Sequence, residues 1–211
     1  MSVLSDLSAA VEKGKRKVVP GLVQQALDEG IDPNMVLNEG MIDAMGRVGE
    51  AFRKGEIFVP EMLIAAKAMQ AGVATLKPAL AQGGGSSRGK VILGTVAGDL
   101  HDIGKNLVGM MIQSAGFEVI DLGVDVADEV FLDTYEKNPD TKIICLSALL
   151  TTTMPAMRST VEKINAASWR GNVKVMVGGA PITQAFCDEI GADCYTPDAA
   201  SAAEAAKKLA G

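Results

Sequence analysis

A single histidine, the only one in this chain of 211 residues, lies in a short stretch that could do chemistry. The stretch reads Asp99-Leu100-His101-Asp102-Ile103-Gly104. The Asp99 carboxylate could accept the proton of one ring nitrogen, which would fix the tautomer and leave the other nitrogen free for a metal. The types and spacing of these two residues therefore suit His101 to be a metal ligand.

By residue type alone, a lone histidine in a loop can equally be an ordinary surface or hydrogen-bonded side chain. One histidine also cannot build a closed zinc site, which needs about four protein ligands. A metal bound by His101 would therefore arrive already coordinated, for example in a haem or a corrin macrocycle. The protein would then supply only an axial ligand.

The residues around His101 are predicted to form a strand and a helix. Residues 91–97 are an apolar run typical of a buried strand, and residues 105–112 have the pattern of a helix. His101 is thus expected in a strand-to-helix loop, where open parallel sheets place their ligand sites. Two more loops are expected at the same sheet edge, the hydroxyl-rich residues 147–153 and Gly178-Gly179-Ala180. Each alone has a structural explanation as a helix cap or a turn, but their convergence predicts a ligand site.

Strand and helix patterns alternate from residue 91 to residue 211. This alternation predicts an α/β fold, a doubly wound, Rossmann-like (flavodoxin-like) parallel sheet of five strands with helices on both faces. The strands are expected at 91–97, 118–122, 142–146, 173–177 and 193–195, and the helices at 104–115, 128–135, 155–166, 183–190 and 199–209.

The first part of the chain has only helical patterns. Residues 1–82 predict a four-helix bundle with short connections. Residues 83–90, which include Gly83-Gly84-Gly85-Ser86-Ser87, are expected to be a flexible linker between this helical domain and a second domain at 91–211.

Composition excludes several classes of function. The net charge of −6 argues against nucleic acid or an anionic membrane as the main partner. There is no apolar run of ~18 residues and no signal peptide pattern at the N-terminus, so a cytoplasmic protein without a membrane span is expected. Cys145, Cys187 and Cys194 show no CxxC spacing and are expected to be structural.

Three motifs together resemble the cobalamin-binding domains. The pattern is Asp-x-His-x-x-Gly at Asp99, His101 and Gly104, then Ser147-x-Leu149, then Gly178-Gly179. Residues 98–106 are similar to the cobalamin region of methionine synthase, and the whole chain resembles the small corrinoid proteins of methyltransferase systems for methylamines, methanol, betaines and methoxyaromatics. The helical segment matches the cap domain of that family.

The resemblance implies cobalamin, with its cobalt, as the cofactor, and His101 as the lower axial ligand in place of the cofactor's own base. Asp99 would be the hydrogen-bond partner of the histidine. Thr153 stands where methionine synthase has the serine that completes this relay. Two cap residues, Phe52 and Val59, would cover the upper face of the corrin, although Phe52 could equally be ordinary bundle core. The remaining residues that the resemblance assigns to cofactor binding are Asp102, Ile103, Gly104, Ser147, Leu149, Thr151, Gly178 and Gly179.

The function implied is a methyl carrier, a subunit rather than a complete enzyme. It would take a methyl group from a substrate-specific methyltransferase as methylcobalamin and pass it to a second methyltransferase, with tetrahydrofolate or a thiol as acceptor. A reductive activating protein would restore oxidised cobalt. The alternatives are the cobalamin subunit of a mutase, which would not need the helical cap, and a cobalamin-sensing regulator, which would need a DNA-binding module. A plain α/β protein that binds another ligand is the third alternative.

Overall fold

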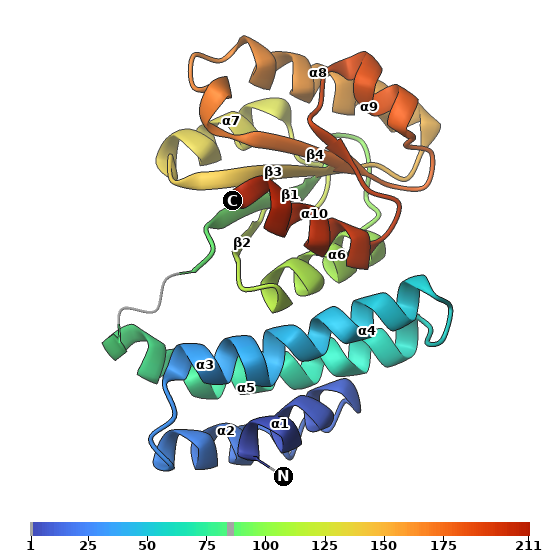
Figure 1. Ribbon diagram of the computed structural model, residues 1–211. Coiled ribbons are helices and arrows are strands. Elements are labelled where there is room, and N and C mark those ends of the chain that lie inside the picture. The colour runs from blue at the N-terminus through green and yellow to red at the C-terminus, as the bar shows by residue number, and fades with distance from the viewer. Residues whose placement is uncertain (1, 84–86) are drawn as a thin grey trace. The chain divides into compact units, whose positions relative to one another are not determined.

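The computed structural model of the chain describes residues 2–83 and 87–211, which form two compact units (Figure 1). The first unit contains the helices α1 to α5, and the second contains a five-stranded sheet with its helices. Each unit has its own set of buried apolar side chains. None of the described helices is long and apolar enough to cross a membrane.

The helical unit consists of four successive helical stretches, as predicted. Its elements are α1 (Val3–Glu12), α2 (Val19–Asp28), α3 (Pro33–Leu37), the π-helical turn η1 (Asn38–Ile42), α4 (Asp43–Arg53) and α5 (Val59–Gly83). Because α3, η1 and α4 follow one another without a break, they form the third of the four stretches.

Particular residues set the ends and contacts of these helices. Asp32 caps α3, since its carboxylate accepts the backbone N–H of Asn34 at 2.8 Å, and Pro33 occupies the first helical position, where no donor is needed. Gly72 of α5 permits a close approach, because a Cβ there would lie 2.5 Å from the Sδ atom of Met41. A larger residue at position 72 would therefore require the side chains of Met41 and Val19 to shift.

The five strands of the second unit are parallel and lie in the order β2-β1-β3-β4-β5. This is the flavodoxin-like order, and it confirms the predicted doubly wound sheet. The chain moves outward in opposite directions from β1 and β3, which makes their carboxyl ends the switch point where such sheets bind ligands. The strands are β1 (Lys90–Thr95), β2 (Glu118–Asp121), β3 (Thr141–Ser147), β4 (Lys174–Gly178) and β5 (Cys194–Tyr195).

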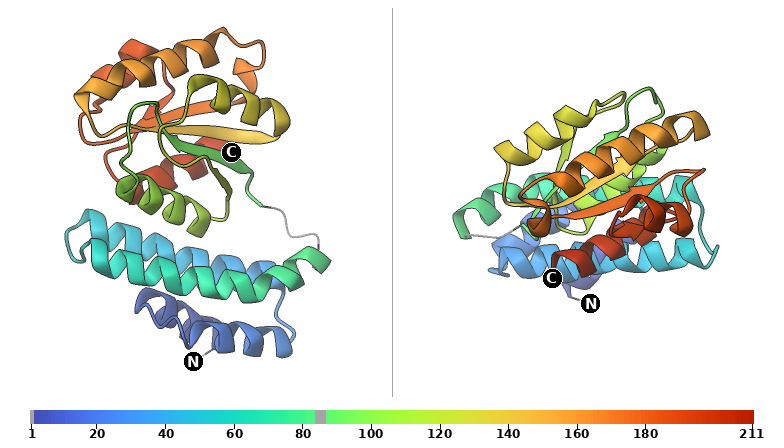
Figure 2. Two further views of the ribbon diagram at one scale, coloured as in Figure 1. Left: turned by 180° about the vertical axis from the view of Figure 1, so that it is seen from behind. Right: turned by 90° about the horizontal axis from the view of Figure 1, so that it is seen from above.

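Helices cover both faces of the sheet, with α7, α8 and α9 on one face and α6 and α10 on the other (Figures 1 and 2). Since strand residues alternate between faces, Ile92 and Ile144 join the core with Phe131 of α7, whereas Leu93 lies against Gly109 of α6. The helical elements are α6 (Ile103–Ser114), α7 (Asp128–Lys137), η2 (Thr151–Thr153), α8 (Met154–Ala166), η3 (Arg170–Asn172), α9 (Gln184–Ile190) and α10 (Ala199–Ala210).

The first strand is displaced from its predicted limits of 91–97. It begins one residue earlier and ends at Thr95, and Val96 keeps only a single bridge to Val126. The chain turns directly after this bridge, because Asp99 donates its N–H to the Val96 carbonyl at 3.2 Å and Gly98 has a φ of +80°. The turn therefore begins nearer to β1 than the apolar pattern indicated.

The two end residues of the predicted linker, residues 83–90, belong to a helix and a strand. Gly83 is the last residue of α5, and Lys90 is the first residue of β1. Residues 84–86 of the linker lie outside the described residues. Glycine-rich composition located this part of the chain, but composition alone does not show where a helix ends.

Candidate functional site

The loop that carries the histidine is held in place by its own backbone and by its neighbours. Thr95, fully buried at the end of β1, donates its hydroxyl to the His101 carbonyl at 2.9 Å. Gly98 donates its N–H to the carboxylate of Asp125 at 2.7 Å, and Asp125 donates its own N–H to the Asp99 carbonyl at 2.9 Å. These contacts fix the backbone on both sides of Asp99.

Asp99 is fully buried, and both of its carboxylate oxygens accept hydrogen bonds. Oδ1 lies 2.7 Å from Nδ1 of His101 and 3.1 Å from its backbone nitrogen. Oδ2 accepts the N–H groups of Leu149 at 2.7 Å and Leu150 at 3.3 Å, and the hydroxyl of Thr153 at 2.8 Å. Burial alone would raise the pKa of Asp99, but the hydrogen bonds from Leu149, His101 and Thr153 outweigh it and hold the pKa well below its usual value.

The imidazole of His101 is thereby oriented from one side only. Because an ionised carboxylate can only accept, Nδ1 carries the ring hydrogen and Nε2 of the neutral ring keeps its lone pair. The side chain is 50% exposed, and Nε2 has no hydrogen-bond partner among the described residues. Within the same residues there is no group of three His, Cys, Asp or Glu side chains that could hold a metal ion. This donor set fits a metal that brings its other ligands with it.

The loop after β3 contributes backbone groups that the sequence did not reveal. Residues 147–153 were expected to offer hydroxyls, and Thr153 does so, but Leu149 and Leu150 bind Asp99 through their N–H groups. No side-chain pattern can show such a contact. The only available signal was the position of these residues directly after a predicted strand.

The glycine pair after β4 shapes the same edge of the sheet. The N–H of Ala148 donates to the Gly178 carbonyl at 3.2 Å, which ties the β3 and β4 loops together. Gly179 has a φ of +131°, and a Cβ at this position would lie 1.8 Å from the Ala148 carbonyl oxygen. Glycine at position 179 is thus required by the loop packing itself, apart from any ligand.

Exposed apolar side chains flank the histidine. Leu100, directly before His101, and Ile103, the first residue of α6, are 72% and 84% exposed. Leu149 and Leu150, whose N–H groups bind Asp99, are also exposed. A group of exposed large apolar side chains in one place is typical of a surface that a ligand or a partner covers. We call Leu100, Ile103, Leu149 and Leu150 the apolar rim.

The remaining predicted site residues of the sheet unit differ in their surroundings. Asp102 is exposed and accepts the side-chain N–H of Asn106 at 3.1 Å. A Cβ on Gly104 would meet nothing within 4 Å, so open space lies beside it. Ser147 ends β3 and is half-buried, and Thr151 is exposed at the start of η2. Open space at Gly104 is compatible with a ligand that passes close to the backbone.

Phe52 and Val59, the two predicted cap residues, belong to the helical unit. Phe52 is half-buried near the end of α4, and Val59 begins α5 with 40% of its surface exposed. They stand on either side of the turn that joins the two helices. An exposed apolar residue at a helix start is consistent with a cover over a ligand and equally with an ordinary surface.

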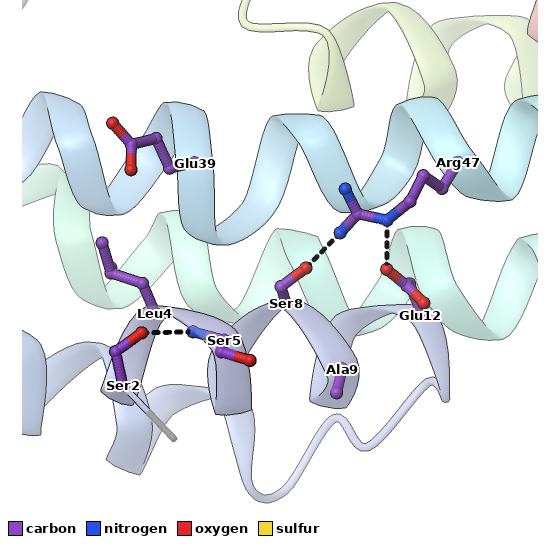
Figure 3. A pocket seen from close by; sticks show the side chains of 8 residues that line it. All are labelled: Ser2, Leu4, Ser5, Ser8, Ala9, Glu12, Glu39 and Arg47. Carbon is purple, nitrogen blue, oxygen red and sulfur yellow. Dashed lines mark hydrogen bonds and ion pairs between the residues drawn. The ribbon is translucent and has the colours of Figure 1, made fainter.

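A hollow of about 460 Å³ in the helical unit is lined by α1, η1 and α4 (Figure 3). Arg47 points into it and donates to the Ser8 hydroxyl and, at 2.6 Å, to the Glu12 carboxylate. The cation is therefore already neutralised within the unit, and nothing in this hollow indicates a ligand. Its lining residues are Ser2, Leu4, Ser5, Ser8, Ala9, Glu12, Glu39 and Arg47.

The three cysteines are free thiols. Cys145 and Cys187 are buried, and burial raises the pKa of Cys187 to about 11. Burial also raises the pKa of Cys145 far above its usual value. Both thiols therefore stay protonated at neutral pH and are poor nucleophiles and metal ligands.

Both parts of the chain match known protein families. One family model, described as a B12 binding domain, matches residues 89–207, and a second model with the same description matches residues 3–77. The dimethylamine corrinoid protein 1 of Methanosarcina acetivorans is 45% identical over 98% of this chain and 97% of its own length. A corrinoid protein of Desulfitobacterium hafniense is 42% identical over 100% of this chain and 99% of its own length.

Solved structures agree with these relatives. A cobalamin-binding protein from Desulfitobacterium hafniense has a TM-score of 0.83 and 32% identity, and the match covers 99% of this chain and 98% of that one. The methanol:cobalamin methyltransferase complex MtaBC from Methanosarcina barkeri has a TM-score of 0.84 and 28% identity, over 99% of this chain and 79% of the matched chain. The predicted resemblance and the predicted cobalamin cofactor are thus confirmed, and the chain belongs to the family of B12-binding corrinoid proteins.

Proposed function

We propose that this chain is a methyl carrier that holds its corrinoid with the cofactor's own base displaced and His101 in its place. A substrate:corrinoid methyltransferase would deliver the methyl group, and a second methyltransferase would remove it for an acceptor such as tetrahydrofolate or a thiol. Two findings support this role: several relatives are named dimethylamine corrinoid proteins, and one structural neighbour is a methanol:cobalamin methyltransferase complex. When bound, the corrinoid supplies the cobalt that takes up and releases the methyl group.

The observation that carries the proposal is the orientation of the only imidazole. Asp99 holds Nδ1 at 2.7 Å, so the lone pair of Nε2 has a fixed direction from a half-exposed ring. The apolar rim around His101 suits the face of a large macrocycle. A protein nitrogen at this place would occupy the lower axial position, which requires that the cofactor's own base leave it.

The same residues can hold a proton. A proton taken up at Nε2 removes the lone pair, so the ring can no longer act as a ligand. The ionised carboxylate of Asp99 would stabilise the imidazolium that forms, and the Thr153 hydroxyl keeps that carboxylate in place. We therefore expect release and return of His101 to be coupled to protonation of the His101–Asp99–Thr153 relay.

The displaced nucleotide tail of the cofactor needs room and polar contacts at the sheet edge. We assign these contacts to Ser147 and Thr151 of the β3 loop and to the backbone at Gly178 and Gly179. The open space beside Gly104 supports a path along the start of α6. Asp102, Ile103 and Leu149 complete the proposed lining of the cofactor site.

The helical unit has a separate part in the proposal. Phe52 and Val59 would cover the upper face of the corrin, where apolar side chains exclude water from the reactive methyl group. Such a cover must move aside whenever a methyltransferase docks. If the cobalt becomes oxidised and inactive, a reductive activating protein, the third partner, would reduce it again.

The first experiment is electron paramagnetic resonance of the protein loaded with cobalt(II) cobalamin. Because His101 is the only histidine, nitrogen-15 histidine labels one side chain. Nitrogen-15 and nitrogen-14 have different nuclear spins, so the axial splitting should change with the label if Nε2 is bound to cobalt. The control is the His101→Ala variant grown with the same labelled histidine, which contains no histidine and should give the same spectrum with and without the label.

Two results of this experiment would overturn the proposal. If cobalamin binds and the label leaves the splitting unchanged, His101 is not the ligand. In a second step, the same sample is chemically reduced and treated with carbon-14 methyl iodide in the dark. If the protein then retains no carbon-14 that light can release, the chain is not a methyl carrier. Far-UV circular dichroism of the His101→Ala variant shows whether the control is folded.

A further inference from the structure

The loop between β2 and α7, residues 122–127, lies against the backbone of the histidine loop. Asp125 forms the closest link, since its carboxylate accepts the Gly98 N–H at 2.7 Å and its own N–H donates to the Asp99 carbonyl at 2.9 Å. One residue therefore holds the chain at two consecutive positions, the second of which is the partner of His101. Its hydrogen bonds go to the backbone and not to the imidazole.

Asp125 has an unusual backbone conformation. Its φ is +52°, and it is the only non-glycine residue with a positive φ in the part of the chain that the structure describes. Aspartate tolerates this region better than most residues, but glycine would adopt it without strain. A strained backbone conformation is kept only where surrounding contacts stabilise it, and such residues are more frequent at functional sites. The side-chain bond to Gly98 is what aspartate adds and glycine cannot supply.

The other end of the same connection is anchored as well. Lys105, which is 3% exposed, places Nζ 2.6 Å and 2.7 Å from the two carboxylate oxygens of Asp121 at the end of β2. Gly123 donates its N–H to Asp121 at 2.9 Å, and its carbonyl accepts the Thr95 N–H at 3.0 Å. The loop is thus fixed to α6 and β1 before it reaches Asp125.

We propose that Asp125 is a positioning residue for the axial ligand. By holding the backbone at Gly98 and Asp99, it keeps the Asp99 carboxylate within hydrogen-bond distance of Nδ1 and so keeps Nε2 directed outward. The proposal rests on the proposed function, because it assigns a purpose to the orientation of His101. It concerns the hydrogen bond that Asp125 accepts, not its charge.

Three substitutions separate the hydrogen bond from charge and backbone strain. Asp125→Ala removes the acceptor, Asp125→Gly removes the acceptor while relieving the positive φ, and Asp125→Asn keeps an oxygen acceptor but removes the charge. The matched control is Asp133→Ala, because Asp133 is exposed on α7 and has no hydrogen-bond partner among the described side chains. Thermal unfolding followed by circular dichroism verifies that each variant is folded.

The probe is cobinamide, a corrinoid without a nucleotide base. An imidazole ligand on the lower face of its cobalt can therefore come only from His101, the single histidine of the chain. We expect Asp125→Ala and Asp125→Gly to weaken cobinamide binding by about five- to tenfold, the usual effect of losing one ordinary hydrogen bond. In the protein without corrinoid, two-dimensional nitrogen-15 spectra of labelled His101 should show the Nδ1–H tautomer in the wild type and a mixture of tautomers in these two variants. Asp125→Asn and Asp133→Ala should match the wild type in both measurements.

Two outcomes would overturn the inference. If Asp125→Ala keeps wild-type affinity and a single tautomer, the hydrogen bond to Gly98 does not position His101. If Asp125→Asn behaves like Asp125→Ala, charge rather than the accepted hydrogen bond is responsible. Failure of the proposed function is distinguishable from both, since the wild type itself would then show no change of axial splitting with labelled histidine.

Discussion

Asp99 is the residue on which the site depends. A fully buried carboxylate would ordinarily be neutral, but the N–H groups of His101, Leu149 and Leu150 and the Thr153 hydroxyl converge on it. These donors favour the charged form, which in turn determines that Nδ1 of His101 carries the hydrogen. The tautomer of the proposed ligand thus follows from the ionisation of its neighbour.

Replacement of Asp99 by Asn should lower the free energy of unfolding by about 2 kcal/mol at pH 7. Both carboxylate oxygens accept hydrogen bonds, and the NH₂ group that replaces one of them cannot accept any. The folded pKa of Asp99 lies below its unfolded value of about 3.9, so the carboxylate stabilises the fold above that value. This contribution is lost as the pH falls toward the lower folded pKa. Urea unfolding of the protein without corrinoid should therefore show a smaller difference between wild type and variant at pH 3 than at pH 7.

Asp133→Asn is the control for this measurement, since Asp133 is exposed and without a hydrogen-bond partner among the described side chains. It should change the free energy of unfolding by less than about 0.5 kcal/mol at either pH. A difference between wild type and Asp99→Asn that does not vary between pH 3 and pH 7 would disprove the assignment of a lowered pKa to Asp99.

At the scale of elements, glycines decide how closely the three loops approach one another. Gly179 lies against the carbonyl of Ala148, and Gly98 turns the chain after β1 with a φ of +80°. The backbone of the histidine loop then reaches the β2–α7 loop through Asp125. The carboxyl ends of β1, β3 and β4 are thus joined through main-chain atoms as well as through the Asp99 side chain.

Two glycine-to-alanine substitutions should have opposite effects. Gly179→Ala should destabilise the protein by about 3 kcal/mol, because its φ is unfavourable for alanine and a Cβ would clash with Ala148. Gly104→Ala meets open space in the first turn of α6 and should stabilise the helix by up to about 1 kcal/mol. Denaturant unfolding measures both changes in the absence of corrinoid.

Cobalamin affinity of the Gly104→Ala variant tests the proposed path of the nucleotide tail, which a stability measurement does not test. If the nucleotide tail runs along the start of α6, Gly104→Ala should weaken cobalamin binding although the protein is at least as stable as the wild type. Cobinamide, which has no tail base, should bind the same variant with less change. Equal affinity of the variant and the wild type for cobalamin would disprove the proposed path of the tail.

At the scale of the whole molecule, the chain consists of two compact units with separate cores. The core of the sheet unit is formed by side chains of β1, β3 and β4 with α7, α8 and α9, and it includes the fully buried Ile92, Phe131 and Ile144. Among the described residues, those that hydrogen-bond Asp99 and those of the apolar rim belong to this unit. The cytoplasmic location and the absence of nucleic-acid and membrane partners stay predictions.

A fragment of residues 87–211 should therefore fold by itself and bind cobinamide through His101. Its far-UV circular dichroism should show the mixed helix and strand content of an α/β domain, with one cooperative thermal transition. The full-length protein is the positive control. A fragment that is unfolded or unable to bind cobinamide would contradict the proposed division into a helical domain and a cofactor-binding domain.

Much of the fold and part of the site could be predicted because the signals are local. Apolar periodicity located the five strands and the five α-helices of the sheet unit within a few residues, with errors at element ends such as Thr95 instead of residue 97. The short 3-10 helices η2 and η3 were not predicted, because three residues are too few to show a period. The contact between Asp99 and His101 could be anticipated because the two residues are only two positions apart in one loop. Exact limits depend on turns and bridges that no periodicity records.

The sequence by itself determined the kinds of element, their order and the single imidazole beside a carboxylate, since these properties depend on neighbouring residues. Only the tertiary structure decided which distant groups meet that carboxylate. The N–H groups of Leu149 and Leu150 reach Asp99 across 50 and 51 positions, and Asp125 reaches Gly98 across 27. Backbone donors carry no signature in residue type, so the sequence could not predict these contacts. They form because parallel strands bring the loops after their carboxyl ends to one edge of the sheet.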